Sequence, residues 1–239
     1  MALEVAPSDL VSSLDLAPRE LVSIVGGGGK TTTLFLLGRD RPGRTVMTTT
    51  TKMGRERTGG YPVLLDPTED DLIEALDRDG SVLAWQEATR HKAVGVTPER
   101  CDSWFEFADT VAVEADGSRQ RPFKAPRPFE PVIPSRTTTV LACIGADALG
   151  RVIGDQCQRP LRVAAAAGCQ PYERLTPARA AAVLTSDRGS QKGRPPGARF
   201  VVVVTRVDES SRQMVIELAG RLEGRAEIVA VTHSDLTGL

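Results

Sequence analysis

Four consecutive glycines followed by a lysine most constrain how this chain can fold. The mostly apolar residues 21–25 lead into Gly26, Gly27, Gly28 and Gly29, and Lys30 and three threonines follow before a second apolar run. This pattern predicts a buried strand, a tight loop and the start of a helix. Glycines let backbone N–H groups point into such a loop with no Cβ in the way, and a helix N-terminus behind it favours anions. The stretch is typical of a phosphate-binding loop.

The match to the full Walker A pattern, G-x-x-x-x-G-K-[ST], is incomplete, because Ile24 stands where its first glycine is expected. The shorter pattern G-x-x-G-K-T fits from Gly26 to Thr31. In such a loop Lys30 reaches the terminal phosphates and the Thr31 hydroxyl is placed to hold Mg²⁺. We include Thr32 in the expected nucleotide-binding set. The prediction is an ATP or GTP site that uses Mg²⁺, and the alternative is a structural turn with an incidental lysine.

A second polar stretch, residues 48–53, follows a short strand predicted at residues 44–47. In open α/β sheets ligands bind at the carboxyl ends of the strands, where this stretch falls. Thr49 and Thr50 offer hydroxyls, and Lys52 offers a positive charge, to a phosphate or to a Mg²⁺-bound water. The alternative is that β-branched threonines only extend the strand.

Two acids at the end of the next predicted strand form a third focus. Glu114 and Asp116 are two residues apart, so both are expected on the same side of the strand's end. P-loop enzymes use a carboxylate delivered by a neighbouring strand to hold Mg²⁺ or orient water. We expect Asp116 to coordinate Mg²⁺, directly or through water, and Glu114 to position water. The alternative is a polar strand end that enters a turn, which the following glycine favours.

Prolines exclude a helix from residues 119–135 and hinder pairing within a sheet. The segment is basic and directly follows Asp116. One interpretation is a stiff flap over the phosphates, in which Arg119 or Lys124 stabilises transferred charge. The other interpretation is a solvated proline-rich linker.

Strand-like and helical segments alternate along the 239 residues, which predicts one α/β domain spanning 1–239. We expect a mostly parallel sheet with helices on both faces, similar to P-loop NTPases, with an excursion at about residues 61–96. Residues 3–16 are expected to form a short amphipathic helix, with Ser8 as a candidate N-cap.

Composition excludes several classes of function. A net charge of -1 and 4% aromatic residues argue against nucleic acid as a partner. No apolar run approaches the roughly 20 residues that span a bilayer, so no membrane partner is expected. The first 18 residues are acidic and unlike a signal peptide, and the four cysteines form no C-x-x-C pair. We therefore expect a cytoplasmic protein with reduced, mostly buried thiols.

A strand predicted at residues 200–204 leads into Thr205-Arg206-Val207-Asp208. This position resembles that of the guanine-reading N-K-x-D motif of GTPases, but only the aspartate is present. An N-cap aspartate before the next helix explains Asp208 equally well.

Several of these motifs together resemble the YqeC family of selenium-dependent hydroxylase accessory proteins. The matching blocks are residues 25–32, 48–53, 113–119, 122–126, 130–134, 145–150 and 192–198. The chain departs from the family pattern at Thr205-Arg206, where asparagine and lysine are expected, and at Gln158, where histidine is expected. The resemblance implies a P-loop nucleotide-binding protein linked to maturation of selenium-dependent molybdenum hydroxylases.

Our main hypothesis is an Mg²⁺-dependent NTPase or phosphotransferase. In it, the loop glycines and Lys30 hold phosphates, Thr31 and Asp116 hold the metal, and Glu114, Thr49 or Thr50 orients the nucleophile. One alternative is a ligase or kinase acting on a small cofactor precursor as acceptor. Another is a nucleotide-gated chaperone that binds a hydroxylase subunit and has negligible turnover.

Overall fold

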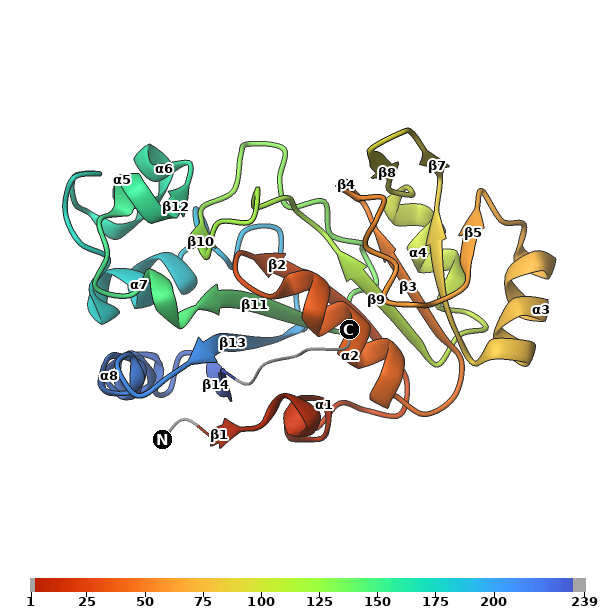
Figure 1. Cartoon of the computed structure of the whole chain (residues 1–239), viewed down its shortest axis with the longest axis horizontal. Coiled ribbons are helices and arrows are strands. Elements are labelled where there is room, and N and C mark those ends of the chain that lie inside the picture. The colour runs from red at the N-terminus through yellow and green to blue at the C-terminus, as the bar shows by residue number, and fades with distance from the viewer. Residues whose placement is uncertain (1–2, 234–239) are drawn as a thin grey trace.

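A parallel sheet forms the centre of the molecule in the computed structural model, which describes residues 3–233 (Figure 1). The order of its strands is β1, β14, β13, β11, β2, β9, β3, β6 and β5, and every neighbouring pair is parallel. The bounds are β1 (Leu3–Val5), β14 (Glu227–Thr232), β13 (Arg199–Val207), β11 (Thr139–Gly145), β2 (Glu20–Gly26), β9 (Thr110–Glu114), β3 (Thr45–Thr49), β6 (Ser81–Trp85) and β5 (Val63–Leu65). The predicted α/β class is confirmed.

Helices cover both faces of this sheet, as predicted. The helices are α1 (Leu10–Ser13), α2 (Lys30–Asp40), α3 (Glu69–Asp79), α4 (Pro98–Trp104), α5 (Ile153–Gln156), α6 (Pro160–Ala167), α7 (Pro177–Leu184) and α8 (Arg212–Leu222). Val22 and Ile24 of β2 pack in one cluster with α1 and α2. Leu21 packs in a cluster with α3 and α4, and Val25 packs in another with α5, α6, α7 and α8. Since side chains alternate along a strand, these helices divide between the two faces.

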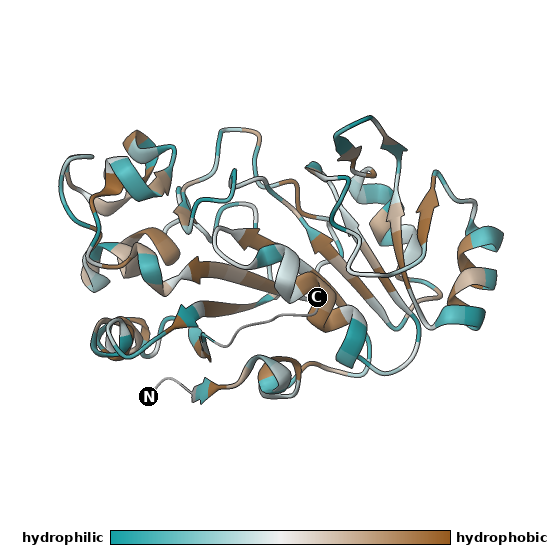
Figure 2. Ribbon diagram, viewed as in Figure 1, coloured by the Kyte–Doolittle hydropathy of each residue, from teal (hydrophilic) through white to brown (hydrophobic). Residues whose placement is uncertain are grey.

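The central strands are buried along their whole length and mostly apolar because both of their faces are covered. Every residue of β2 and of β11 is buried, and Figure 2 shows the central strands predominantly in the hydrophobic colour. The run Phe200–Val204 of β13 is buried in the same way. Within residues 3–233, no helix is long and apolar enough to cross a membrane.

The N-terminal segment is not the single helix expected for residues 3–16. Residues 3–5 form β1, which pairs with Val229–Val231 of β14, and a 3-10 turn (η1, Pro7–Asp9) leads into the short α1. The Ser8 side chain makes no capping hydrogen bond. The prediction was wrong because pairing with β14 is a tertiary contact that amphipathic spacing cannot reveal.

Residues 61–96 contribute to two sheets. Strands β5 and β6 extend the main sheet, with α3 between them in the chain. Thr68 starts α3 with a capping box, in which its side chain accepts from the Asp71 N–H and the Asp71 carboxylate accepts from the Thr68 N–H. Strands β7 (Glu87–Ala88) and β8 (Lys92–Val94) instead form a small antiparallel sheet with β4 (Lys52–Gly54).

The glycine-rich loop lies at the topological switch point of the sheet, where the chain changes the side of β2 on which it adds strands. After β2 the chain proceeds through β3 on one side, and after β9 it crosses to β11 on the other side of β2. Ligand sites of open α/β sheets lie at such switch points, beyond the carboxyl ends of the strands. The ends of β2, β9, β11 and β13 therefore frame the candidate site.

Candidate functional site

The glycine-rich loop joins β2 directly to α2 and requires glycine for its path. Gly26 and Gly28 have φ values of 94° and 74°, in the left-handed region. A Cβ on Gly26 would lie 2.3 Å from the Cys143 carbonyl oxygen, and one on Gly28 would lie 2.5 Å from the Gly145 nitrogen. The loop is therefore pressed against β11, and Gly29 forms the N-cap of α2. Helix α2 begins at Lys30 with its N-terminus toward the loop.

Lys30 is buried at the base of this loop. Its Nζ donates to the Gly26 carbonyl oxygen at 2.8 Å and lies 3.4 Å from Asp116 Oδ1 and 3.6 Å from Glu114 Oε1. Burial by itself lowers the pKa of Lys30, but attraction to Asp116 and Glu114 raises it above the ordinary value. The lysine is therefore a fixed cation. The two acids that the sequence predicted at the end of β9 both lie next to it.

Those two acids have different surroundings. Glu114 Oε2 accepts from the Thr31 hydroxyl at 2.8 Å, and both residues line a hollow at the surface. Asp116 is 2% exposed, accepts from the Gly26 N–H at 3.1 Å and pairs with Lys124 at 2.9 Å. Asp116 therefore contacts the loop and two lysines inside the protein, whereas Glu114 faces the hollow.

Lys124 begins a chain of buried charges that leads away from the loop. Its Nζ, besides meeting Asp116, donates to Glu130 Oε2 at 3.1 Å and to the Gly117 carbonyl oxygen at 2.9 Å. Arg159 in turn donates to Glu130 Oε1 at 2.9 Å. Lys124 is 1% exposed and does not line the hollow, so in this structure it acts on the loop through Asp116.

The hollow beside the loop has a volume of about 480 Å³ and is rich in positive charge. It holds the sequence-predicted Lys30, Thr31, Thr32, Lys52 and Arg119, together with Glu114 and the loop glycines Gly28 and Gly29. Three further cations line it that were not predicted as site residues, namely Arg57, Lys92 and Arg206. Their place at the hollow has no local sequence signal, because folding brings them together from the turn after β4, from β8 and from β13.

The threonines at the end of β3 do not reach this hollow. Thr49 is fully buried, and its hydroxyl donates to the Glu114 carbonyl oxygen at 2.7 Å. The Thr50 hydroxyl donates to the Val132 carbonyl oxygen at 2.6 Å. Both hydroxyls therefore tie strands and loops together, and of the polar residues predicted here only Lys52 lies at the hollow.

The proline-rich segment is anchored on the protein rather than solvated along its length. Val132 N donates to the Ala115 carbonyl oxygen at 2.9 Å. Lys192 Nζ donates to the carbonyl oxygens of Arg127 at 2.5 Å and of Glu130 at 2.7 Å. Its first residue, Arg119, has a φ of 51° and reaches the hollow. The segment thus covers the end of β9 and brings one arginine to the site.

Within residues 3–233 no group of three or more His, Cys, Asp and Glu side chains could hold a metal ion. A Mg²⁺ site does not require such a group, because Mg²⁺ is held by one or two carboxylates together with phosphates and waters. Cysteines do not contribute to the hollow: Cys101, Cys143 and Cys157 are buried, and Cys169 is half-buried. Burial raises the pKa of Cys143, which neighbours Thr33, to about 12.

Fold and site together define an α/β protein with a glycine-rich strand–loop–helix at the switch point of a parallel sheet. The model of a family described as YqeC protein matches residues 22–161. A protein of Escherichia coli (strain K12) named uncharacterized protein YqeC is 32% identical over 213 residues, which cover 86% of this chain and 83% of that protein. The chain belongs to the YqeC family. No solved structure matches it.

Proposed function

We propose that this protein binds a nucleoside triphosphate with Mg²⁺ at the glycine-rich loop. The observation that carries the proposal is the position of Lys30, a buried cation at the N-terminus of α2, at the base of a hollow with other cations around it. The helix N-terminus and Lys30 both favour an anion. Arg119, Lys52 and Arg206 add charge from three other elements.

The residues at the hollow fit Mg²⁺. Thr31 and Glu114 present two oxygen atoms that could serve as metal ligands. They lie 2.8 Å apart at the end of the loop where terminal phosphates would lie. When bound, Mg²⁺ would neutralise charge on the phosphate oxygens. Asp116, which the sequence suggested as the metal ligand, is held between two lysines, so we assign it to positioning Lys30. Glu114 would lose the Thr31 hydroxyl as partner when that hydroxyl turns to the metal.

The chemical step that the site supports is phosphoryl transfer to water or to an acceptor, in which the protein mainly positions groups and stabilises charge. Lys30 would neutralise β- and γ-phosphate oxygens, and Arg119 would approach the transferred phosphate from the proline-rich segment. Because the motifs resemble those of selenium-dependent hydroxylase accessory proteins, we propose that this activity serves the maturation of selenium-dependent molybdenum hydroxylases.

The test is a titration of ATP and GTP, with Mg²⁺, into the wild type and Lys30→Ala, with phosphate release followed in the same samples. We expect Lys30→Ala to weaken binding by about 100-fold, or about 2.8 kcal/mol. Arg221→Ala, which removes one exposed cation on α8, should bind as the wild type does. No binding of either nucleotide to the wild type would overturn the proposal.

Phosphate release separates the forms of this function. Phosphate release without additions indicates an NTPase, and phosphate release only with an added small acceptor indicates a ligase. Nucleoside diphosphate that forms only with the acceptor, without phosphate release, indicates a kinase, because the phosphate is then bound to the acceptor. Tight binding without release, together with nucleotide-dependent capture of a purified hydroxylase subunit, indicates a gated chaperone.

A further inference from the structure

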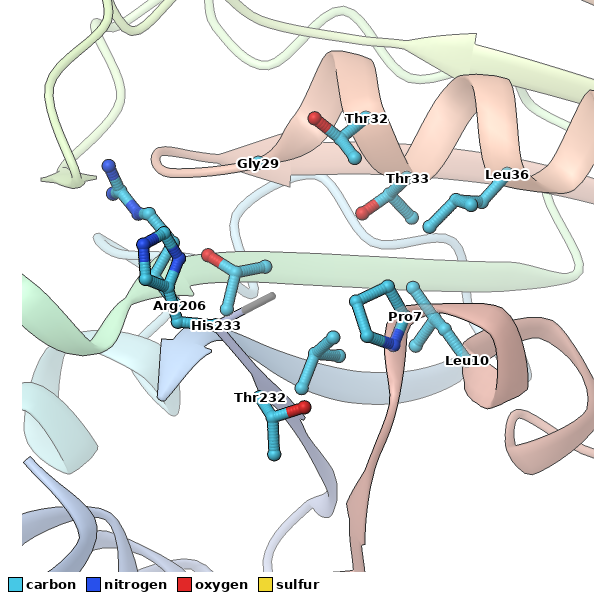
Figure 3. A pocket seen from close by; sticks show the side chains of 11 residues that line it. Pro7, Leu10, Gly29, Thr32, Thr33, Leu36, Arg206, Thr232 and His233 are labelled. Atoms are coloured by element: carbon cyan, nitrogen blue, oxygen red, sulfur yellow. The ribbon is translucent and has the colours of Figure 1, made fainter. Parts of the chain in front are cut away.

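A second hollow adjoins the glycine-rich loop on the other side of α2. It has a volume of about 310 Å³, at the lower end of the range for small-molecule sites. Its walls are mostly apolar and come from four parts of the chain that converge in Figure 3. The lining residues are Pro7 and Leu10 before and in α1, Thr32, Thr33 and Leu36 of α2, Thr205 and Arg206 of β13, and Val231, Thr232 and His233 at the end of β14, together with Gly29.

The apolar hollow adjoins the basic hollow. Gly29, Thr32 and Arg206 line both of them. A ligand whose phosphates lie at the loop therefore has an adjoining space with mostly apolar walls for the rest of its structure. The basic hollow suits the phosphates of a nucleotide, and the apolar hollow suits its nucleoside.

Arg206 lies at the junction in an unusual conformation. Its φ is 57°, a left-handed value that non-glycine residues rarely adopt outside constrained sites. Its guanidinium packs on the loop so closely that a Cβ on Gly28 would lie 2.9 Å, and one on Gly145 2.1 Å, from a terminal nitrogen. That nitrogen is 2.8 Å from Asp147 Oδ1, but neither it nor the shielded Nε forms a hydrogen bond of good geometry within the described part of the chain. The guanidinium therefore places a positive charge beside both hollows.

Asp208, the residue that the sequence compared with a guanine reader, faces elsewhere. Its carboxylate accepts from the Ser211 N–H and from the Ser210 hydroxyl, each at 2.8 Å. It lines a separate hollow together with Asp147. Asp208 therefore belongs to the turn before α8 and does not line the apolar hollow.

We propose that the apolar hollow binds the purine nucleoside part of the nucleotide and that Arg206 contacts it where the sugar joins the phosphates. This assignment rests on the proposed function and adds the site for the base. Leu36, Leu10 and Val231 supply apolar contact to the flat base. Since Asp208 does not read the base, adenine and guanine nucleotides bind with affinities within about tenfold of each other.

The test compares Mg²⁺-ATP with Mg²⁺-tripolyphosphate, which has the phosphates but no nucleoside. Thr232→Trp places a large ring at the half-buried rim of the apolar hollow, away from the loop. We expect this variant to weaken ATP binding at least tenfold and to leave tripolyphosphate binding unchanged. Ile216→Trp, an exposed position on α8, is the matched control and should bind both ligands as the wild type does.

Tripolyphosphate binding also reports whether Thr232→Trp is folded. Equal affinity of the wild type for ATP and tripolyphosphate, or unchanged ATP binding by a folded Thr232→Trp, would overturn the assignment of the hollow. Failure of the wild type to bind either ligand would instead overturn the phosphate site itself.

A second measurement does not depend on any variant. Light-activated 8-azido-ATP should label peptides that contain Leu36 or residues 231–233, and excess ATP should prevent it. Labelling confined to other parts of the chain would contradict the proposal.

Discussion

Lys30 and Asp116 form a buried ion pair, with Nζ 3.4 Å from Oδ1 and each side chain 3% exposed. The lysine also donates to the Gly26 carbonyl oxygen, so its amine is fixed at the loop before any ligand arrives. A buried charge is tolerated only when it is paired, and Asp116 supplies the pair. The same contact thus stabilises the fold and keeps the cation where a phosphate would meet it.

The pH dependence of stability should report this pair. Attraction to Asp116 and Glu114 outweighs burial and raises the pKa of Lys30 above its ordinary 10.5. Because the folded-state pKa is above the unfolded one, the contribution of charged Lys30 is fully present below about pH 10 and is lost as pH rises through the folded pKa. We expect the difference in unfolding free energy between wild type and Lys30→Met to be constant below about pH 10 and to shrink above it.

Urea unfolding at a series of pH values measures this difference. Lys52→Met, at an exposed lysine of the same hollow, serves as control and should show no such trend. A difference that stays constant to the highest pH at which the protein folds would contradict the role given to the pair.

Lys124 should matter more for stability than for nucleotide binding. It pairs with Asp116 and Glu130 inside the protein but does not line the basic hollow. Removing one partner of a buried pair costs about 3–5 kcal/mol, and Lys30 and Arg159 remain to offset part of this in Lys124→Met. We expect Lys124→Met to lower the free energy of unfolding by about 2–3 kcal/mol while weakening ATP binding less than Lys30→Met does. The opposite order of affinities would place Lys124 at the phosphates.

The loop, the parallel sheet and the meeting of Lys30 with Glu114 and Asp116 were accessible from sequence because each follows from local pattern. A strand that ends in glycines positions Lys30, and the two acids at and just beyond the end of β9 both lie beside it. Strand β11 is paired with β2 on the side away from β9. Adjacency of parallel strand ends then brings these residues together.

Other features depend on contacts between distant parts of the chain. Thr49 and Thr50 look like ligands in sequence, but their hydroxyls are occupied by carbonyl oxygens of residues 114 and 132. Which of two acids faces solvent depends on Lys124, a residue of the proline-rich segment. Arg206 differs from the expected motif residue, and its left-handed backbone has no sequence signature.

Gly28 should not tolerate a side chain. An added Cβ would meet the Gly145 nitrogen at 2.5 Å, in a backbone conformation with φ of 74°. We expect Gly28→Ala to destabilise the protein by about 1–3 kcal/mol. The control is Gly220→Ala in α8, where no atom lies within 4 Å and the helix should gain about 0.5–1 kcal/mol. Thermal and urea unfolding measure both changes, and equal effects of the two variants would contradict the close approach of the loop to β11.

Thiol reactivity should distinguish Cys169 from the other cysteines. Burial raises the pKa of Cys157 and of Cys143 to about 12, and Cys101 is also buried, whereas Cys169 is half-buried. Because the thiolate is the reactive form, we expect one fast-reacting thiol in the native protein at about pH 8 and four in urea. Mass spectrometry should locate the fast label, and Cys169→Ser should remove it. Fast labelling of Cys143 would show that the loop and β11 separate in solution.

Thr31 and Glu114 should determine how nucleotide binding depends on Mg²⁺. Their oxygens are 2.8 Å apart at the hollow, whereas Asp116 is enclosed by Lys30 and Lys124. Mg²⁺ should raise the ATP affinity of the wild type. We expect Thr31→Val and Glu114→Gln each to remove most of this gain, so that their affinity with Mg²⁺ is at least about tenfold, or about 1.4 kcal/mol, weaker than that of the wild type. Without Mg²⁺, Glu114→Gln should bind ATP at least as well as the wild type, because a negative charge beside the phosphates is gone.

Titrations of ATP with and without Mg²⁺ measure the coupling, and Thr49→Val is the matched control because its hydroxyl faces the Glu114 carbonyl oxygen, away from the hollow. That variant should lose some stability but keep the Mg²⁺ dependence of the wild type. If Asp116→Asn abolished the Mg²⁺ effect while Glu114→Gln kept it, the metal would lie on the buried side of Lys30. The loop would then have to open for the metal to enter, since Asp116 is 2% exposed.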